Sequence, residues 1–207
     1  VPAGSVTDDT EQALILAGLL IDGGGRIDPH QLADALLRWE DDMRARGSLD
    51  LLGPSTKLAL ERVRAGVDPH CTGRQGTTNG SAMRVAPVGI AFSLSTDGNA
   101  LARSVQASCL VTHDTRQGFE AAGLLAAAVS AAIDGVDAAG ALEAALDFVA
   151  AHPEEGHWTA RASVAARTRL ALETSRDLHG DALAEHLRTY VGTSVESAES
   201  VPCALVI

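Results

Sequence analysis

Residues 7–10 of this chain form a compact block of oxygen-bearing side chains, Thr7-Asp8-Asp9-Thr10. Carboxylates and hydroxyls are hard ligands, which magnesium, manganese and calcium prefer and zinc and copper do not. Leucines recur at helical spacing directly behind the block, so it is predicted to lie on the first turn of a helix over residues 8–21.

Two interpretations of this block follow from its position. Thr7 or Asp8 can be the N-cap of the helix, with Asp8 and Glu11 arranged as a capping box. Alternatively, the same side chains turn into a cleft and bind a metal ion. The block alone favours capping, because acidic residues are common at helix starts.

A second unusual stretch is rich in glycine and small hydroxyls: Gly73-Arg74-Gln75-Gly76-Thr77-Thr78-Asn79-Gly80-Ser81. It leads into a predicted apolar helix over residues 82–91. Glycines let a backbone approach a ligand, and the amides of a helix start attract anions, so the stretch could cradle a diphosphate. It lacks the lysine of a Walker loop and the preceding strand of a dinucleotide fingerprint. A long polar turn with an N-cap serine explains the stretch about as well.

His113 lies at a junction between two predicted helices, within Thr112-His113-Asp114-Thr115. Its ring could cap a carbonyl or present a nitrogen to a ligand phosphate or ribose, and capping is favoured for an isolated histidine. The acidic run at residues 40–42 is interpreted as a solvated helix face.

The composition predicts an all-α fold, and the length allows one large domain or two small ones. The chain has 207 residues with 46% hydrophobic and 3% aromatic content, so its core must be built from Ala, Leu and Val, which suits closely packed helices. No alternating β-branched run demands a sheet. The predicted helices cover residues 8–21, 29–46, 53–65, 82–91, 97–111, 115–134, 138–151, 159–176, 181–190 and a last helix from 199.

Charge and cysteine content limit the classes of partner. A net charge of −11 argues against non-specific binding to nucleic acid or anionic membranes. Cys71, Cys109 and Cys203 are far apart and lack CxxC spacing, so neither a disulfide framework nor a zinc site is predicted, and a reducing cytoplasm is the expected setting. The longest small-apolar run, residues 121–133, is too short to span a membrane.

Several stretches taken together resemble the ADP-ribosylglycohydrolase family, which includes the enzyme that reactivates dinitrogenase reductase. The resemblance spans essentially the whole chain and is carried by residues 6–10, residues 77–84 with Pro87 and Gly89, Thr112-His113, and residues 199–202 with Ala204. It implies a compact, orthogonal multi-helix all-α domain with two Mg²⁺ or Mn²⁺ ions. The implied substrate is ADP-ribose linked to a protein side chain or a small-molecule acceptor.

The resemblance also implies roles for particular residues. Thr7, Asp8 and Asp9 would be metal ligands, and Asp8 or Asp9 would be catalytic by orienting a metal-bound water. His113 would help the glycine-rich loop to hold the diphosphate and ribose of the ligand. Hydrolysis at an anomeric carbon passes through an oxocarbenium-like state, which two hard cations can assist by positioning ribose hydroxyls and water. The loop residues that would wrap the diphosphate and ribose are Gly76, Thr77, Thr78, Asn79, Gly80 and Ser81.

The chain departs from the family pattern at both ends. The family carries a second metal-binding segment, a DxDT pattern after a glycine pair, and nothing after Pro202 supplies it. A GDALG-like start is also absent before Val1. We therefore expect these 207 residues to be an internal fragment of a longer protein, with little or no turnover when isolated.

The alternative function is a non-catalytic ADP-ribose binder or a structural protein, since relatives of the family serve as lens crystallins. The pattern leaves the acceptor, the choice between Mg²⁺ and Mn²⁺, and the oligomeric state open.

Overall fold

The computed structural model describes residues 4, 6–48 and 52–207 and shows an all-α protein, as predicted. Within this part of the chain no strand is present, and two isolated β-bridges join Thr78 to Glu196 and Thr115 to His157. None of the described helices is long and apolar enough to cross a membrane. The helices are α1 (Asp8–Asp22), α2 (Pro29–Ala45), α3 (Pro54–Arg64), α4 (Pro69–Thr72), α5 (Ala86–Ala91), α6 (Leu94–His113), α7 (Arg116–Ile133), α8 (Ala138–Ala150), α9 (Val164–Ser175), α10 (Gly180–His186), the π-helix η2 (Leu187–Val191) and α11 (Ser197–Val206).

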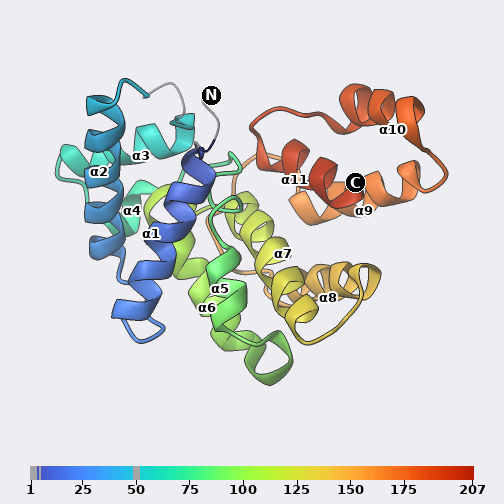
Figure 1. Cartoon of the computed structure of the whole chain (residues 1–207), viewed down its shortest axis with the longest axis horizontal. Coiled ribbons are helices and arrows are strands. Elements are labelled where there is room, and N and C mark those ends of the chain that lie inside the picture. Colours follow the sequence, from blue (N-terminus) through green and yellow to red (C-terminus); the bar gives the residue numbers. More distant parts are fainter. Residues whose placement is uncertain (1–3, 5, 49–51) are drawn as a thin grey trace.

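Helix α7 is the centre of the fold (Figure 1), with α1 and α2 on one side of it and α9 and α11 on the other. Most of α7 is buried, including a run of alanines that lets neighbouring helices approach closely. Gly123 has the same effect where α7 meets α8, because a Cβ there would lie 3.1 Å from the Val149 side chain. Alanine, leucine and valine make up most of the described buried hydrophobic residues, as the composition predicted.

The helix starts are partly as predicted. Asp28 caps α2 by accepting a hydrogen bond from the Gln31 amide at 3.0 Å. At α1, however, Thr7 is the N-cap without a side-chain hydrogen bond, so the predicted capping box is wrong. The Glu11 carboxylate instead accepts hydrogen bonds from Arg46 at 2.9 and 3.0 Å and from the Trp39 indole at 2.6 Å. Arg46 and Trp39 together lower the pKa of Glu11 below its ordinary value.

The predicted helix over residues 82–91 is also wrong in its first half. Residues 79–84 form turns, and α5 begins only at Ala86. Pro87 explains this start, because proline suits the first turn of a helix and disrupts its interior. The loop therefore does not present a helix N-terminus at Ala82, which removes one of the two arguments for a diphosphate cradle.

Two further helix predictions need correction. Helix α9 begins at Val164 with Ser163 as its cap, and not at residue 159. Thr159 precedes it in a loop, where its hydroxyl donates to the Gln117 side chain of α7 at 2.7 Å. The short helix α4 was not predicted, although Asp68 and Pro69 provide a cap and a first-turn proline.

The acidic run at residues 40–42 is only partly a solvated face. Glu40 is 3% exposed and accepts from the Arg64 guanidinium of α3 at 3.0 Å. The same arginine contacts the exposed Asp41 at 2.6 Å. Glu40 is buried because Arg64 neutralises it at the contact between α2 and α3.

Candidate functional site

Asp8 and Asp9 lie in one cavity with three residues of the glycine-rich loop, Thr78, Asn79 and Gly80. The cavity has a volume of about 200 Å³. The first turn of α1 thus faces a loop about seventy positions later in the sequence, as the family resemblance requires. The start of α3 and a residue just before α11 complete the lining, which also includes Gly53, Pro54, Thr56, Met83 and Val195.

The electrostatics around Asp8 favour a bound cation. Partial burial raises the pKa of the Asp8 carboxyl, and the neighbouring charge of Asp9 raises it further. Among the described residues, the other charged group that acts on Asp8 is Glu11, also an acid. Because like charges repel in a partly desolvated site, a positive ion would lower the free energy of the ionised pair.

Thr7 does not line this cavity. It is exposed, and its carbonyl accepts the Glu11 amide at 3.2 Å as the N-cap of α1. Thr7 directly precedes the acidic pair in the sequence, but it is not among the residues that line the cavity.

The other loop residues that were predicted from the sequence hold the loop in place. They are Thr77, Ser81 and Gly76. The Thr77 hydroxyl donates to Glu196 at 3.0 Å, and the Ser81 hydroxyl donates to the Gly118 carbonyl at the start of α7 at 3.0 Å. Gly76 packs against the end of α6 so closely that a Cβ would clash with the Thr112 carbonyl oxygen. Glycine at this position allows the loop to pack closely against the end of α6.

The loop is also joined to the segment before α11. The Asn79 amide donates to the Val195 carbonyl at 2.9 Å, and the Ser197 hydroxyl donates to the Thr78 carbonyl at 2.7 Å. These contacts cross more than a hundred positions of sequence. They fix the backbone of Thr78 and Asn79 at the cavity.

His113 is completely buried and reaches the cavity through Thr78. Its Nε2 lies 3.0 Å from the Thr78 hydroxyl, and its Nδ1 lies 2.8 Å from the Thr112 hydroxyl. Burial, and secondarily the nearby Arg84 charge, lowers the pKa of His113 well below its ordinary value. The ring is therefore neutral at pH 7, and its contribution to ligand binding stays a prediction.

Arg84 determines the direction of these hydrogen bonds. Its guanidinium donates to the Thr112 hydroxyl at 2.6 Å, to the Ser108 carbonyl at 2.9 Å and to the Gln12 side chain at 2.9 Å. A guanidinium can only donate, so the Thr112 oxygen accepts from Arg84. Among the described contacts of the Thr112 hydroxyl, the acceptor for its own proton is His113 Nδ1, which selects the tautomer that is protonated at Nε2. His113 Nε2 then donates to Thr78, which leaves the Thr78 hydroxyl proton available to the cavity.

Sequence reasoning assigned no role to Arg84 or Thr56. Arg84 is fully buried, which lowers its pKa to about 10, so it stays charged at neutral pH. The available signal was a lone arginine among small and apolar residues over 81–85. Thr56 lines the cavity from α3, and only the helix start at Gly53-Pro54 hinted at its position.

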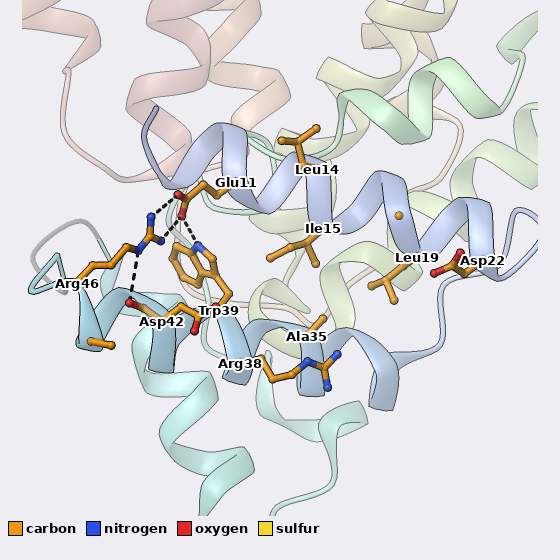
Figure 2. Close-up of a pocket in the computed structure, with 12 residues that line it drawn as sticks. Glu11, Leu14, Ile15, Leu19, Asp22, Ala35, Arg38, Trp39, Asp42 and Arg46 are labelled. Carbon is orange, nitrogen blue, oxygen red and sulfur yellow. Dashed lines mark hydrogen bonds and ion pairs between the residues drawn. The ribbon is translucent and has the colours of Figure 1, made fainter. Parts of the chain in front are cut away.

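A larger cavity lies elsewhere, in a groove of about 730 Å³ between α1 and α2. Figure 2 shows Leu14, Ile15 and Leu19 along α1, with Glu11 bonded to Trp39 and Arg46 at one end. These polar groups bind one another, and the groove contains none of the residues singled out for chemistry. The smaller cavity at Asp8 and Asp9 is therefore the candidate site.

A sequence profile of the ADP-ribosylglycohydrolase family matches residues 1–207. The chain belongs to the ADP-ribosylglycohydrolase family. It is 34% identical over 203 residues to the uncharacterized Escherichia coli K12 protein YegU, covering 97% of this chain and 60% of YegU. An uncharacterized protein of Archaeoglobus fulgidus is 30% identical over 203 residues, covering 98% of this chain and 60% of that protein.

A relative with a described activity is the ADP-ribosylarginine hydrolase Tri1 of Pseudomonas putida, 33% identical over 144 residues, or 65% of this chain and 37% of Tri1. A solved structure described as an ADP-ribosylglycohydrolase-related protein complex matches with a TM-score of 0.63 and 26% identity, covering 100% of this chain and 60% of that one. The all-α architecture is thus the ADP-ribosylglycohydrolase fold. The chain spans about 60% of the length of the first relatives it matches.

Proposed function

We propose that the protein containing this chain is a metal-dependent hydrolase that cleaves the glycosidic bond between ADP-ribose and a modified side chain or other acceptor. The observation that carries the proposal is the shared cavity of Asp8 and Asp9 with Thr78, Asn79 and Gly80. It joins an acidic pair to a polar loop, which are the two components that such a reaction needs.

The donors present fit Mg²⁺ or Mn²⁺. Asp8 and Asp9 would hold the ions, with Thr7 as a further ligand by family resemblance, and all three offer hard oxygens. The raised pKa of Asp8 supports this fit, since its charge is not compensated by a described cation. When bound, such ions supply positive charge that positions ribose hydroxyls and a water at the anomeric carbon.

The loop would bind the ADP-ribose unit. In the tautomer in which His113 Nε2 donates to the Thr78 oxygen, the Thr78 hydroxyl keeps its own proton for a ligand oxygen. Asn79 and Gly80 lie beside it in the lining, where an amide and exposed backbone can contact phosphate or ribose. The neutral His113 ring positions Thr78 and adds no charge to the site.

Calorimetry of ADP-ribose binding to the 207-residue chain, with and without Mg²⁺, tests this proposal. We expect Mg²⁺ to strengthen binding, and we expect Asp8→Asn with Asp9→Asn to abolish that effect. Asp34→Asn, which changes an exposed carboxylate on α2, is the matched control. Equal binding with and without Mg²⁺ would favour a non-catalytic ADP-ribose binder.

Release of ADP-ribose from modified peptides tests the catalytic part. We expect Mn²⁺-dependent release by the protein that contains this chain, and we expect Asp8→Asn with Asp9→Asn to lower it. Equal release by the Asp8→Asn, Asp9→Asn protein would contradict a role of the acidic pair in the reaction.

A further inference from the structure

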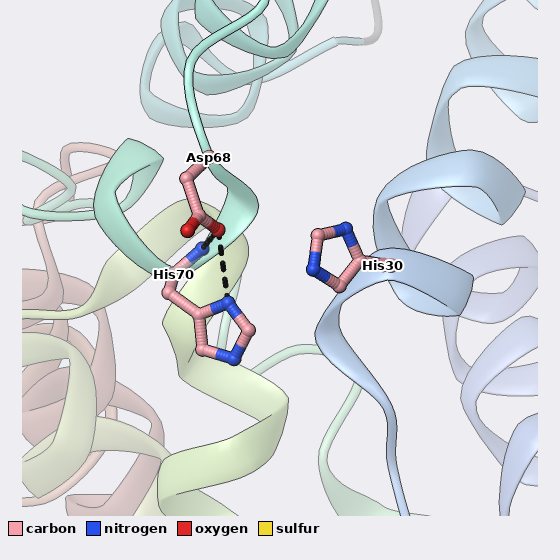
Figure 3. Close-up of side chains that lie close together, drawn as sticks. All are labelled: His30, Asp68 and His70. Carbon is pink, nitrogen blue, oxygen red and sulfur yellow. Dashed lines mark hydrogen bonds and ion pairs between the residues drawn. The ribbon is translucent and has the colours of Figure 1, made fainter.

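Three exposed side chains outside the candidate site form a cluster of potential metal ligands: His30, Asp68 and His70. Each offers one ligand atom, and these atoms all lie within 4.8 Å of one another. Figure 3 shows His70 and Asp68 on one segment and His30 facing them from α2. None of the three lines the cavity at Asp8 and Asp9.

The backbone fixes two of the three ligands relative to each other. Asp68 is the N-cap of α4, and its Oδ1 accepts the His70 amide at 3.0 Å and lies 2.9 Å from His70 Nδ1. Pro69 between them restricts the backbone further. Asp68 Oδ1 and His70 Nδ1 are within hydrogen-bond distance of each other, so a bound ion would take the place of the proton between them after a small increase in their separation.

His30 completes the set from a distant part of the sequence. It lies in the first turn of α2, and its ring centroid is 5.4 Å from that of His70 in an edge-on arrangement. The ligand atoms lie within 4.8 Å of one another, and side-chain rotation can bring them to the spacing of about 3.3 Å that tetrahedral coordination at about 2.0–2.1 Å requires. All three side chains are exposed, so an ion can enter and such a rotation meets little resistance.

We propose that His30, Asp68 and His70 form a binding site for Zn²⁺ or a similar late first-row divalent ion. Two imidazoles and one carboxylate are the donor set that such ions prefer, whereas Mg²⁺ prefers oxygen ligands only. Three protein ligands leave a coordination position for water. This site differs in metal preference from the acidic pair at Asp8 and Asp9.

Metal binding at this site would join α2 to the segment that precedes the glycine-rich loop. Helix α4 ends at Thr72, and the loop begins at the next residue. An ion held by His30 and His70 would therefore restrain the start of that loop relative to α2. Binding to the folded state alone would also raise the thermal unfolding midpoint.

The test is calorimetric titration of Zn²⁺ into metal-free, untagged protein that carries Asp8→Asn and Asp9→Asn, so that the acidic pair does not contribute. We expect one equivalent of Zn²⁺ to bind, and His30→Ala, His70→Ala and Asp68→Asn each to weaken binding by about tenfold or more. Asp68→Asn is informative because asparagine can still cap α4. His70→Ala preserves the cap because the cap uses its backbone amide.

His179→Ala, at the exposed start of α10, is the control and should leave Zn²⁺ affinity unchanged. Zn²⁺ should also raise the unfolding midpoint of the background protein and not that of its His30→Ala variant. Unchanged Zn²⁺ affinity in His30→Ala and His70→Ala would overturn the proposal, as would an equal loss in His179→Ala. None of these results depends on ADP-ribose binding, so the two proposals can fail independently.

Discussion

His113 Nε2 lies 3.0 Å from the Thr78 hydroxyl in a fully buried contact between the end of α6 and the glycine-rich loop. Thr78 is also a lining residue of the cavity that contains Asp8 and Asp9. His113 therefore contacts a residue that lines the cavity but is not itself part of the lining. The hydrogen bonds from Arg84 through Thr112 to His113 determine how Thr78 is presented there.

Thr112→Val removes the hydroxyl that joins Arg84 to His113. We expect a loss of about 1–3 kcal/mol in the free energy of unfolding, because the change leaves buried polar groups without partners. Thr168→Val is the control, since Thr168 is equally buried but bonds only within α9, and its loss should be below about 1 kcal/mol. Urea denaturation measures both. Equal losses would show that the Arg84 connection adds nothing to stability.

Gly80→Ala tests the close packing of the loop on His113. A Cβ at Gly80 would lie 2.7 Å from His113 Cε1 and 3.1 Å from Nε2, and the buried ring has little room to move. We expect a loss of about 1–3 kcal/mol in stability and weaker ADP-ribose binding by calorimetry.

Gly18→Ala is the matched control for that change. Gly18 lies within α1, and a Cβ there meets nothing within 4 Å. Alanine should raise stability by about 0.5–1 kcal/mol, since glycine is unfavourable in a helix interior. If Gly80→Ala is as well tolerated as Gly18→Ala, the loop is not packed as tightly as described.

His113 should make stability fall as the pH falls. Its pKa is well below 6.5 in the folded protein, so below about pH 6.5 the unfolded chain binds a proton that the folded protein does not. This adds a slope of up to about 1.4 kcal/mol per pH unit, with stability lost toward acid. Urea denaturation between about pH 7 and pH 5 should show a shallower slope for His113→Asn. The same slope in both proteins would contradict a buried neutral ring.

The sequence predicts the fold well because the helices depend on local signals. Asp28 with Pro29 specifies the start of α2 correctly, and the Ala-rich segment specifies α7. Two of the failed predictions depend on a distant partner, whereas the late start of α5 follows from the local signal of Pro87. Glu11 was predicted to cap α1, but it accepts a hydrogen bond from Arg46. Glu40 was predicted to be solvated, but it is buried against Arg64.

The same reasoning explains what could be predicted about the candidate site. The resemblance identified Asp8, Asp9 and the loop, because those stretches are contiguous in sequence. It did not separate Thr78, which lines the cavity, from Ser81, which bonds to α7. That distinction depends on which side of the loop faces α6 and α7. The order of residues along the loop does not show which side this is.

Asp8 should make the stability of the metal-free protein depend on pH in the opposite direction to His113. The folded pKa of Asp8 is raised above its ordinary value of 3.8, so the folded state binds more protons just above that pH. The stabilisation that protonated Asp8 contributes is fully present below the pKa of Asp8 in the unfolded chain. It is lost as the pH rises through the pKa of Asp8 in the folded protein. Stability relative to Asp8→Asn should therefore fall as the pH rises above about 4.

Mg²⁺ should reverse this relationship, because a cation favours the ionised carboxylates. At about pH 7, saturating Mg²⁺ should raise the unfolding free energy of the unmodified chain and leave that of the Asp8→Asn, Asp9→Asn protein nearly unchanged. Urea denaturation with and without Mg²⁺ measures the difference, with Asp34→Asn as the control at an exposed carboxylate. An equal Mg²⁺ effect in all three proteins would show that the ion acts elsewhere, and the acidic pair would then be no metal site.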